Sequence, residues 1–364
     1  MFFSKPIIGI EELKAVNLVL KSGVLAQNEK TYEFEKKFSE FCGSKYAVAV
    51  NSGTAALHCS LFAIGIKEGD EVITTPFTFV ATANSIIMQK AKVIFADISE
   101  EDFNIDPSKI EDKITDKTKA ILAVDLFGNI FDYEKIENVS KKYNLSIIED
   151  ACQAIGSEFK GKKAGNYGDL GCFSFYATKN MTTGEGGMVV TNNEKYAELC
   201  RSFRHHGQLS KSYEYYSLGY NYRMTDISAA IGLEQLKKIN DFNLCRIRNA
   251  ELLSEGLSNI KGIIIPKLKS SDYVSNFHQY TIRITKEFKL TRDQLKEYLK
   301  EKNVPTAIFY PYPLHLTPHF RNYGYKTGDF PMTEKISQEV LSLPVNPLIS
   351  EKDIKYITDI IKRI

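Results

Sequence analysis

The stretch that decides the fold is Ala47-Val-Ala-Val-Asn-Ser-Gly-Thr-Ala-Ala-Leu57, in which a short apolar run meets a turn of small residues and a helix-forming segment. It predicts a buried strand followed by a helix over residues 55–64. Outward from this stretch, predicted strands and helices continue to alternate along the chain. Apolar runs of strand length lie at residues 71–75, 92–96, 120–124 and 145–148, and a helix is expected at 132–143. Short strands at 173–175 and 188–191 bring the count to about seven. This alternation predicts an α/β fold with a mostly parallel seven-stranded sheet and helices on its faces.

The pattern changes after residue 225. Residues 227–238 and 245–257 are expected to form two long helices, followed by a strand at 279–284, a helix at 292–302 and a proline-rich segment at 305–318. We therefore predict a large α/β domain over residues 1–240 and a smaller α+β domain over residues 241–364. The length agrees, because 364 residues at roughly 150 residues per domain correspond to about two domains.

Composition excludes several classes of function. Hydrophobic residues make up 43% and charged residues 25%, which is typical of a folded globular protein. A net charge of +2 provides no field that would hold a nucleic acid. No apolar run reaches the roughly 18 residues of a membrane helix or forms a secretion signal, and the six cysteines include no Cys-x-x-Cys pair. We expect a cytoplasmic protein with reduced thiols, no membrane insertion and no nucleic-acid partner.

A phosphate site is the first functional candidate. Small residues at Ser52, Gly53 and Thr54 would let backbone N–H groups approach an anion at the start of a helix. The competing interpretation is an ordinary helix cap by Ser52 or Thr54, which we would favour if this motif stood alone.

Asp150 is the second candidate, in the stretch Leu145-Ser-Ile-Ile-Glu-Asp-Ala-Cys-Gln-Ala154. It lies at the carboxyl end of a buried strand, where open α/β sheets bind ligands. A carboxylate at that place can hold a proton on a heterocyclic nitrogen. Capping of the next helix is an equally good interpretation of Asp150 taken alone.

Lys179 is the third candidate, between a buried strand and the glycine-rich turn Gly184-Glu-Gly-Gly187. Desolvation there would lower the pKa of its amine and make it a usable nucleophile. A lysine without such neighbours would be a surface cation. The turn is not a dinucleotide-binding fingerprint, because no Gly-x-Gly-x-x-Gly follows a strand.

Together the three candidates match one cofactor. Pyridoxal phosphate requires a Schiff-base lysine, a carboxylate on its pyridine nitrogen and an anchored phosphate. The joint occurrence of Lys179, Asp150 and the small-residue turn on one sheet outweighs the separate alternatives.

At these residues the chain resembles the DegT/DnrJ/EryC1/StrS family of pyridoxal-phosphate-dependent nucleotide-sugar aminotransferases, whose architecture is fold type I. The resemblance runs nearly end to end, and its motifs are Asn51-Ser-Gly-Thr54, Pro76-Phe-Thr-Phe79, Glu149-Asp-Ala-Cys-Gln153, residues 174–187, Tyr220-Asn-Tyr-Arg-Met-Thr-Asp226 and Tyr310-Pro-Tyr-Pro-Leu-His315. It departs from the common pattern at Asn28, where glycine is usual, and at Cys152, where alanine is usual.

The resemblance implies roles residue by residue. Lys179 matches the cofactor lysine, Asp150 the partner of the pyridine nitrogen, Gln153 the residue near the ring hydroxyl, and Phe79 the aromatic that stacks on the ring. Further matches are to phosphate contacts (Gly53, Thr54, Ser174, and Asn221 from a neighbouring subunit) and to positions that line the substrate pocket (Arg223, Tyr310, His315). The Asn221 match implies a homodimer with shared active sites. His205 and His206 are interpreted as structural, and no metal site is expected.

The implied activity is transfer of an amino group from L-glutamate to a nucleotide-linked ketosugar, with pyridoxamine phosphate as the intermediate form of the cofactor. The run Thr182-Thr-Gly-Glu-Gly-Gly187 resembles members that act on 4-keto-6-deoxyhexoses rather than on 3-ketosugars. Three alternatives stay open: a 3-ketosugar aminotransferase, a dehydratase-like member, against which Lys179 argues, and a non-catalytic regulator on the same fold. The sugar, the nucleotide, the carbon that is aminated and the pathway are not specified by the sequence.

Overall fold

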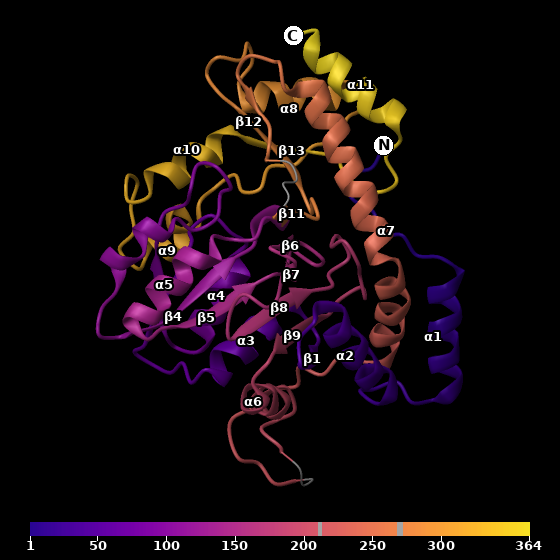
Figure 1. Ribbon diagram of the computed structural model, residues 1–364, viewed down its shortest axis with the longest axis vertical. Helices are drawn as coiled ribbons and strands as arrows, with labels where there is room; N and C mark the ends of the chain where they lie inside the picture. The colour runs from indigo at the N-terminus through magenta and orange to yellow at the C-terminus, as the bar shows by residue number, and fades with distance from the viewer. Residues whose placement is uncertain (210–212, 268–271) are drawn as a thin grey trace.

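Seven strands form the central sheet of the computed structural model, which describes residues 1–209, 213–267 and 272–364 (Figure 1). Their order across the sheet is β1-β9-β8-β5-β4-β2-β3. Only β9 runs antiparallel to its neighbours, so the sheet is mostly parallel, as the sequence predicted. The strands are β1 (Tyr46–Val50), β2 (Glu71–Thr74), β3 (Lys92–Phe95), β4 (Thr118–Val124), β5 (Ser146–Asp150), β8 (Leu170–Ser174) and β9 (Gly187–Thr191).

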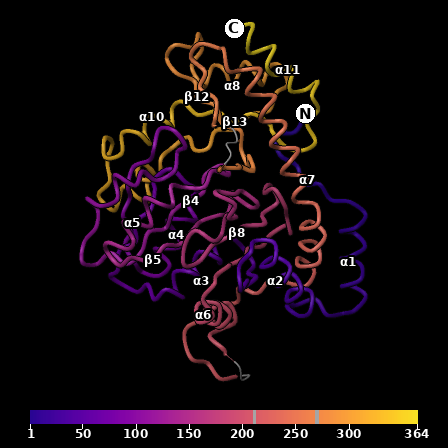
Figure 2. The backbone as a smooth tube through the Cα atoms, in the orientation of Figure 1, coloured from indigo at the N-terminus to yellow at the C-terminus, as the bar shows by residue number. Residues whose placement is uncertain are grey.

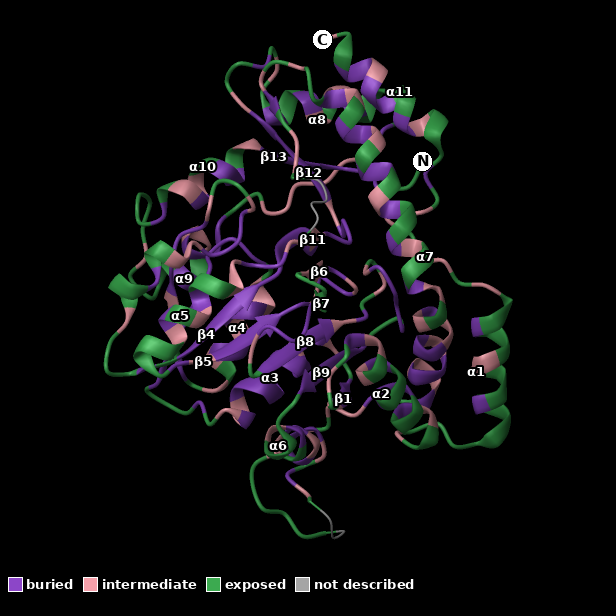
Figure 3. Ribbon diagram, in the orientation of Figure 1, coloured by how far each residue is buried: buried purple, intermediate pink, exposed green. Residues whose placement is uncertain are grey.

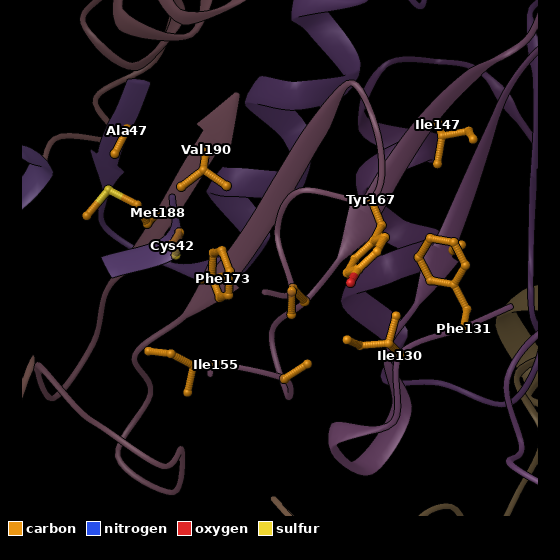
Figure 4. Close-up of a cluster of buried hydrophobic side chains, with 14 of the residues drawn as sticks. Cys42, Ala47, Ile130, Phe131, Ile147, Ile155, Tyr167, Phe173, Met188 and Val190 are labelled. Atoms are coloured by element: carbon orange, nitrogen blue, oxygen red, sulfur yellow. The ribbon is translucent and has the colours of Figure 1, made fainter. Parts of the chain in front are cut away.

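Helices cover both faces of this sheet because side chains alternate along each strand. In β1, Val48 and Val50 belong to the core that also contains buried residues of α3 (Gly53–Ala63), α4 (Val80–Met88) and α6 (Glu194–Arg204). Ala47 and Ala49 face the opposite core, which is covered by α2 (Glu29–Cys42), α5 (Tyr133–Tyr143) and the first half of α7 (Asp226–Leu257). Part of that second core, including Phe173, Met188 and Val190, appears in Figure 4, and Figure 3 shows the strands buried between exposed helix faces.

A separate core lies at the C-terminal end of the chain. It contains Ala250, Leu253 and Leu257 of α7 and buried residues of an antiparallel sheet in the order β10-β12-β13. The elements of this part are β10 (Ile263–Ile264), β12 (Tyr280–Ile284), α8 (Arg292–Glu301), β13 (Val340–Leu343) and α11 (Glu351–Lys362). Of two short helices before β13, α9 (Pro318–Arg321) packs against the large-sheet core. The other, α10 (Pro331–Glu339), contacts both the loops of the large sheet and β12.

The two helices expected at residues 227–238 and 245–257 are one continuous helix, α7, of 32 residues. It passes through residue 240, where the sequence placed a domain boundary (Figures 1 and 2). Its side chains change from the large-sheet core to the C-terminal core between Ile239 and Ala250. The division into two domains stays a prediction.

The N-terminal segment crosses between the two parts. Helix α1 (Ile10–Ser22) lies along α7, whereas the carbonyl oxygens of Phe2 and Phe3 accept hydrogen bonds from the Asn346 side chain near α11. Two minor strands, β6 (Glu158–Phe159) and β7 (Lys162–Lys163), pair with β11 (Tyr273–Val274). All six cysteines are unpaired. No helix among the described residues is both long and apolar enough to span a membrane.

Candidate active site

A cavity of about 760 Å³ opens at the carboxyl ends of the parallel strands. The residues that follow β1, β5 and β8 line it, together with Phe3 and Ser4 from the N-terminus and a segment that precedes β12. This edge is where an open α/β sheet presents loop residues and helix N-termini to a ligand.

The turn after β1 forms one wall of the cavity. Helix α3 begins at Gly53, and the Ser52 hydroxyl accepts a hydrogen bond from Ala55 N at 3.1 Å. Ser52 is therefore the helix cap, while the N–H groups of Gly53 and Thr54 have no acceptor among the described residues and line the cavity. A Cβ added at Gly53 would lie 2.8 Å from Ser174 Cβ, so only glycine leaves this corner open. The structure shows the Ser52 cap. The free N–H groups of Gly53 and Thr54 suit a phosphate, and that role stays a prediction.

Asp150 ends β5 with its carboxylate in the cavity. Its Oδ2 accepts a hydrogen bond from Thr82 Oγ1 at 2.8 Å, and Oδ1 accepts one from Cys152 N at 3.3 Å. Thr82 in turn lies 3.0 Å from the Thr78 hydroxyl, in the loop and helix that follow β2. Asp150 is thus held in place by helix α4, which follows β2, rather than by capping a helix of its own.

Lys179 lies on the loop between β8 and β9, on the same cavity as Asp150. Removal from water lowers the pKa of its ammonium group, and the nearby Cys152 and Asp150 only partly offset this effect. The loop is fixed on both sides, because Lys179 N donates to Tyr176 O at 2.8 Å and Thr183 N donates to Phe175 O at 3.0 Å. A fixed lysine with a lowered pKa is suited to act as an amine nucleophile.

Gln153 connects two further walls. Its Oε1 accepts a hydrogen bond from Phe127 N at 2.9 Å, and its Nε2 donates to the Tyr310 hydroxyl at 3.3 Å. Burial raises the pKa of Tyr310, so this phenol stays protonated at neutral pH. Phe79, with 58% of its surface exposed, lines the cavity at the start of α4 and presents an exposed aromatic ring.

These groups fit pyridoxal phosphate. The cavity holds an amine with a lowered pKa, a fixed carboxylate, an aromatic ring and a pair of free N–H groups beside the Ser174 hydroxyl. Lys179, Asp150, Phe79, Gly53, Thr54 and Ser174 are the residues that would hold the cofactor.

Three predicted site residues do not line this cavity. His315 is fully buried, with Nε2 3.0 Å from Glu334 Oε1, because η4 (Leu314–Leu316) turns it toward α10. The Arg223 guanidinium contacts His205 Nδ1. Asn221 is exposed and reaches Asn51 only through its backbone oxygen, 3.3 Å from Asn51 Nδ2. The substrate role inferred for His315 is therefore not reproduced within this chain.

The cavity also contains residues that the sequence analysis did not assign. Phe3, Phe127, His278 and Gln279 line it. Phe127 follows the carboxyl end of β4, whereas Phe3, His278 and Gln279 arrive through tertiary packing rather than through a strand-end motif. Cys152, noted only as a departure from the family pattern, lies on the wall beside Gly53. Burial and Asp150 raise the pKa of its thiol, so it is not a nucleophile at neutral pH.

Comparison with known proteins agrees with this geometry. A sequence model of the DegT/DnrJ/EryC1/StrS aminotransferase family matches residues 6–362. The chain is 39% identical to the spore coat polysaccharide biosynthesis protein SpsC of Bacillus subtilis (strain 168), over 100% of this chain and 96% of that protein. It is 38% identical to the GDP-perosamine synthase of Escherichia coli O157:H7, over 98% and 96% of the two chains.

Solved structures show the same fold. DesV of S. venezuelae, in complex with a ketimine intermediate, matches with a TM-score of 0.93 at 31% identity, over 97% of this chain and 94% of that chain. The PLP-form of Spr1654 from Streptococcus pneumoniae matches with a TM-score of 0.93 at 28% identity, over 100% and 98%.

The chain therefore belongs to the DegT/DnrJ/EryC1/StrS aminotransferase family. It is an aminotransferase of the fold type I class, and its cofactor is pyridoxal 5'-phosphate, which passes through the pyridoxamine form. The fold class and the cofactor predicted from the sequence are confirmed.

Proposed function

We propose that the protein transfers the amino group of L-glutamate to a nucleotide-linked 4-keto-6-deoxyhexose and so produces an aminosugar. The observation that carries this proposal is the convergence of Lys179, Asp150 and the free N–H groups of α3 on one cavity of about 760 Å³. The names of relatives support the sugar part: one is a GDP-perosamine synthase and another a spore coat polysaccharide biosynthesis protein.

Each residue has a stated task in this proposal. When bound, pyridoxal phosphate supplies an electron sink for the carbon that gains or loses the amino group. Lys179 binds the cofactor and, once free, moves the proton on and off that carbon, for which its lowered pKa suits it. The Asp150 carboxylate holds the proton on the pyridine nitrogen, and the Gly53 and Thr54 N–H groups bind the phosphate.

The sugar side of the cavity is assigned to the segment that contains Tyr310. Its hydroxyl lies at the cavity wall beside Gln153, and Tyr312, two residues later, is 72% exposed. Prolines at 311 and 313 stiffen this segment. Aromatic rings with polar tips suit a sugar nucleotide, which is larger and more polar than an amino acid.

A homodimer with shared active sites is part of the proposal. Asn221 and Arg223 do not line the cavity of their own chain, and the Asn221 side chain is exposed. A second copy of the chain would bring Asn221 to the phosphate, as the resemblance implies.

We further assign the enzyme to the cytoplasm, where unpaired thiols such as Cys59 and Cys200 persist.

A regulator is the second candidate, because a relative of Geobacillus stearothermophilus that is 39% identical over 96% of this chain is named a pleiotropic regulatory protein. A regulator need not catalyse amino transfer.

One experiment separates the aminotransferase from the regulator: purified enzyme is incubated with ¹⁵N-labelled L-glutamate and a panel of nucleotide ketosugars, and the products are analysed by mass spectrometry and NMR. Incorporation of ¹⁵N at carbon 4 supports the proposal. Incorporation only into 3-ketosugars would correct the substrate, and no incorporation with any sugar would favour the regulator.

A further inference from the structure

His278 lines the active-site cavity without a role in the chemistry assigned so far. It lies just before β12, is 7% exposed and lines the same cavity as Lys179. Its Nδ1 lies 3.2 Å from Oδ1 of Asn180, the residue next to Lys179 in the chain. Its Nε2 has no partner among the described residues and is not sealed inside the protein.

The hydrogen bonds of two asparagines determine which nitrogen of His278 carries the proton. Asn243 Nδ2 donates to the backbone oxygen of Ile155 at 2.9 Å, so Asn243 Oδ1 is left to accept from Asn180 Nδ2, also at 2.9 Å. Asn180 Nδ2 also donates to the backbone oxygen of Asn276 at 3.2 Å. Asn180 Oδ1 therefore faces His278, and only a protonated Nδ1 can donate to it.

The same surroundings keep the imidazole neutral. Burial, with the positive charges of Lys179 and Arg246, lowers the pKa of His278 well below its ordinary value. With the proton on Nδ1 and no second proton, Nε2 presents a lone pair to the cavity.

We propose that His278 is a positioning residue whose Nε2 accepts a hydrogen bond from the Lys179 amine when that amine is not bonded to the cofactor. This inference rests on the proposed function, because it needs Lys179 to alternate between bound and free. The free amine must aim at one carbon, and an acceptor fixed by the Asn180 and Asn243 hydrogen bonds limits its rotation. Misplacement of the reacting amine by about 1 Å can reduce the rate about 100-fold.

Two substitutions separate this role from a purely structural one. His278→Asn keeps a donor near the Nδ1 position, and so the bond to Asn180, but removes the acceptor near Nε2. His278→Gln keeps an acceptor near Nε2 and gives up the donor near Nδ1. His58→Gln is the matched control, because His58 is also buried and neutral and bonds Tyr222 rather than the cavity.

The test measures the half-reaction of the cofactor-loaded enzyme with L-glutamate in a stopped-flow spectrometer. We expect His278→Asn to slow it about 100-fold with an unchanged KM for glutamate, and His278→Gln and His58→Gln to stay within about 10-fold of the unmodified enzyme. The visible band of the bound cofactor should persist in all three. A slow Gln variant beside a normal Asn variant, or equal rates in both, would overturn the proposal.

A second readout does not depend on activity. Protein labelled with ¹⁵N-histidine, studied with and without cofactor, should show one histidine with its proton on Nδ1 and no titration between about pH 6 and pH 9. This signal should be absent from the His278 variants. A proton on Nε2, or an imidazolium, would contradict the inference. Should the protein lack any reaction with glutamate while the Nδ1–H signal is present, the proposed function fails and the predicted tautomer still holds.

Discussion

Asp150 shows at the scale of one residue how the site combines sequence and packing. Its place at the end of β5 follows from the strand pattern, whereas the bond from Thr82 that orients it depends on the packing of helix α4. Because an amide cannot hold the pyridine proton as a carboxylate does, we expect Asp150→Asn to reduce transamination by about 100-fold or more. Steady-state assays with glutamate measure this effect.

The control for that variant is Asp97→Asn. Asp97 is also a buried carboxylate beyond a strand end, but it accepts hydrogen bonds from Thr333 and Met332 outside the cavity. We expect this variant to lose stability and to keep its turnover number. Near-normal turnover of Asp150→Asn would contradict the role of Asp150 in holding the proton on the pyridine nitrogen.

Residues at strand ends could be predicted from the sequence, and residues placed by long-range packing could not. Lys179, Asp150, Gln153 and Gly53 meet because parallel strands end at one edge. His315 was assigned from its motif alone, and its orientation toward Glu334 depends on α10, which no local pattern reveals. Similarly, His278 precedes an ordinary strand and carries no sequence signal of its position beside Asn180.

Helix α3 makes a prediction at the scale of one element. Gly53→Ala would place a Cβ 2.8 Å from Ser174 Cβ and 3.0 Å from Cys152 Sγ, in the corner where the N–H groups are free. Overpacking of this kind costs about 1–3 kcal/mol, which, if it opposes cofactor binding in full, corresponds to a roughly 5- to 150-fold loss of cofactor affinity. Absorbance titration of the cofactor-free protein with pyridoxal phosphate measures it. Unchanged affinity would argue against a phosphate at this helix.

Helix α1 makes a second prediction, on stability and pH. Glu12 is buried against α7, where burial opposes its ionisation, but hydrogen bonds from Lys238, Gln235 and Gly9 lower its pKa to about 2. Since this folded-state pKa lies below the ordinary value of 4.5, the contribution is present above pH 4.5 and is lost as the pH falls through about 2. We expect Glu12→Gln to lower the free energy of unfolding by about 2 kcal/mol at pH 7 and by progressively less below pH 4.5.

Urea unfolding of Glu12→Gln between pH 7 and pH 3 measures that difference. Glu11→Gln is the control, because Glu11 bonds the same Lys238 from an exposed position and its loss should have no measurable effect. If Glu12→Gln lowered the free energy of unfolding equally at every pH, side-chain packing rather than the charge of Glu12 would hold α1 against α7.

Helix α7 shows why the sequence predicted a break that the structure lacks. Residues 239–244 contain Asn240, Asp241 and Asn243, which are weak helix formers and favour a turn. In the structure the Asn243 side chain bonds the Ile155 oxygen and the Asn180 amide. This tertiary contact outweighs local propensity and keeps the helix continuous between the two cores.

At the scale of the whole molecule, the shared active site predicts complementation between two inactive chains. A Lys179→Ala chain and an Asn221→Ala chain should each be inactive as homodimers. In a mixed dimer, one of the two sites has both residues intact, so random mixing should restore about a quarter of full activity. Absence of complementation, or a fully active monomer in sedimentation experiments, would contradict the shared site.

The central claim is that Lys179 binds pyridoxal phosphate in the cavity at the carboxyl edge of the sheet. The most direct measurement is reduction of the cofactor-loaded enzyme with borohydride, followed by digestion and mass spectrometry of the peptides. The account predicts one modified peptide, with the added cofactor mass on Lys179 and a stoichiometry of about one per chain. Modification of a different lysine, or of many lysines at low occupancy, would contradict it.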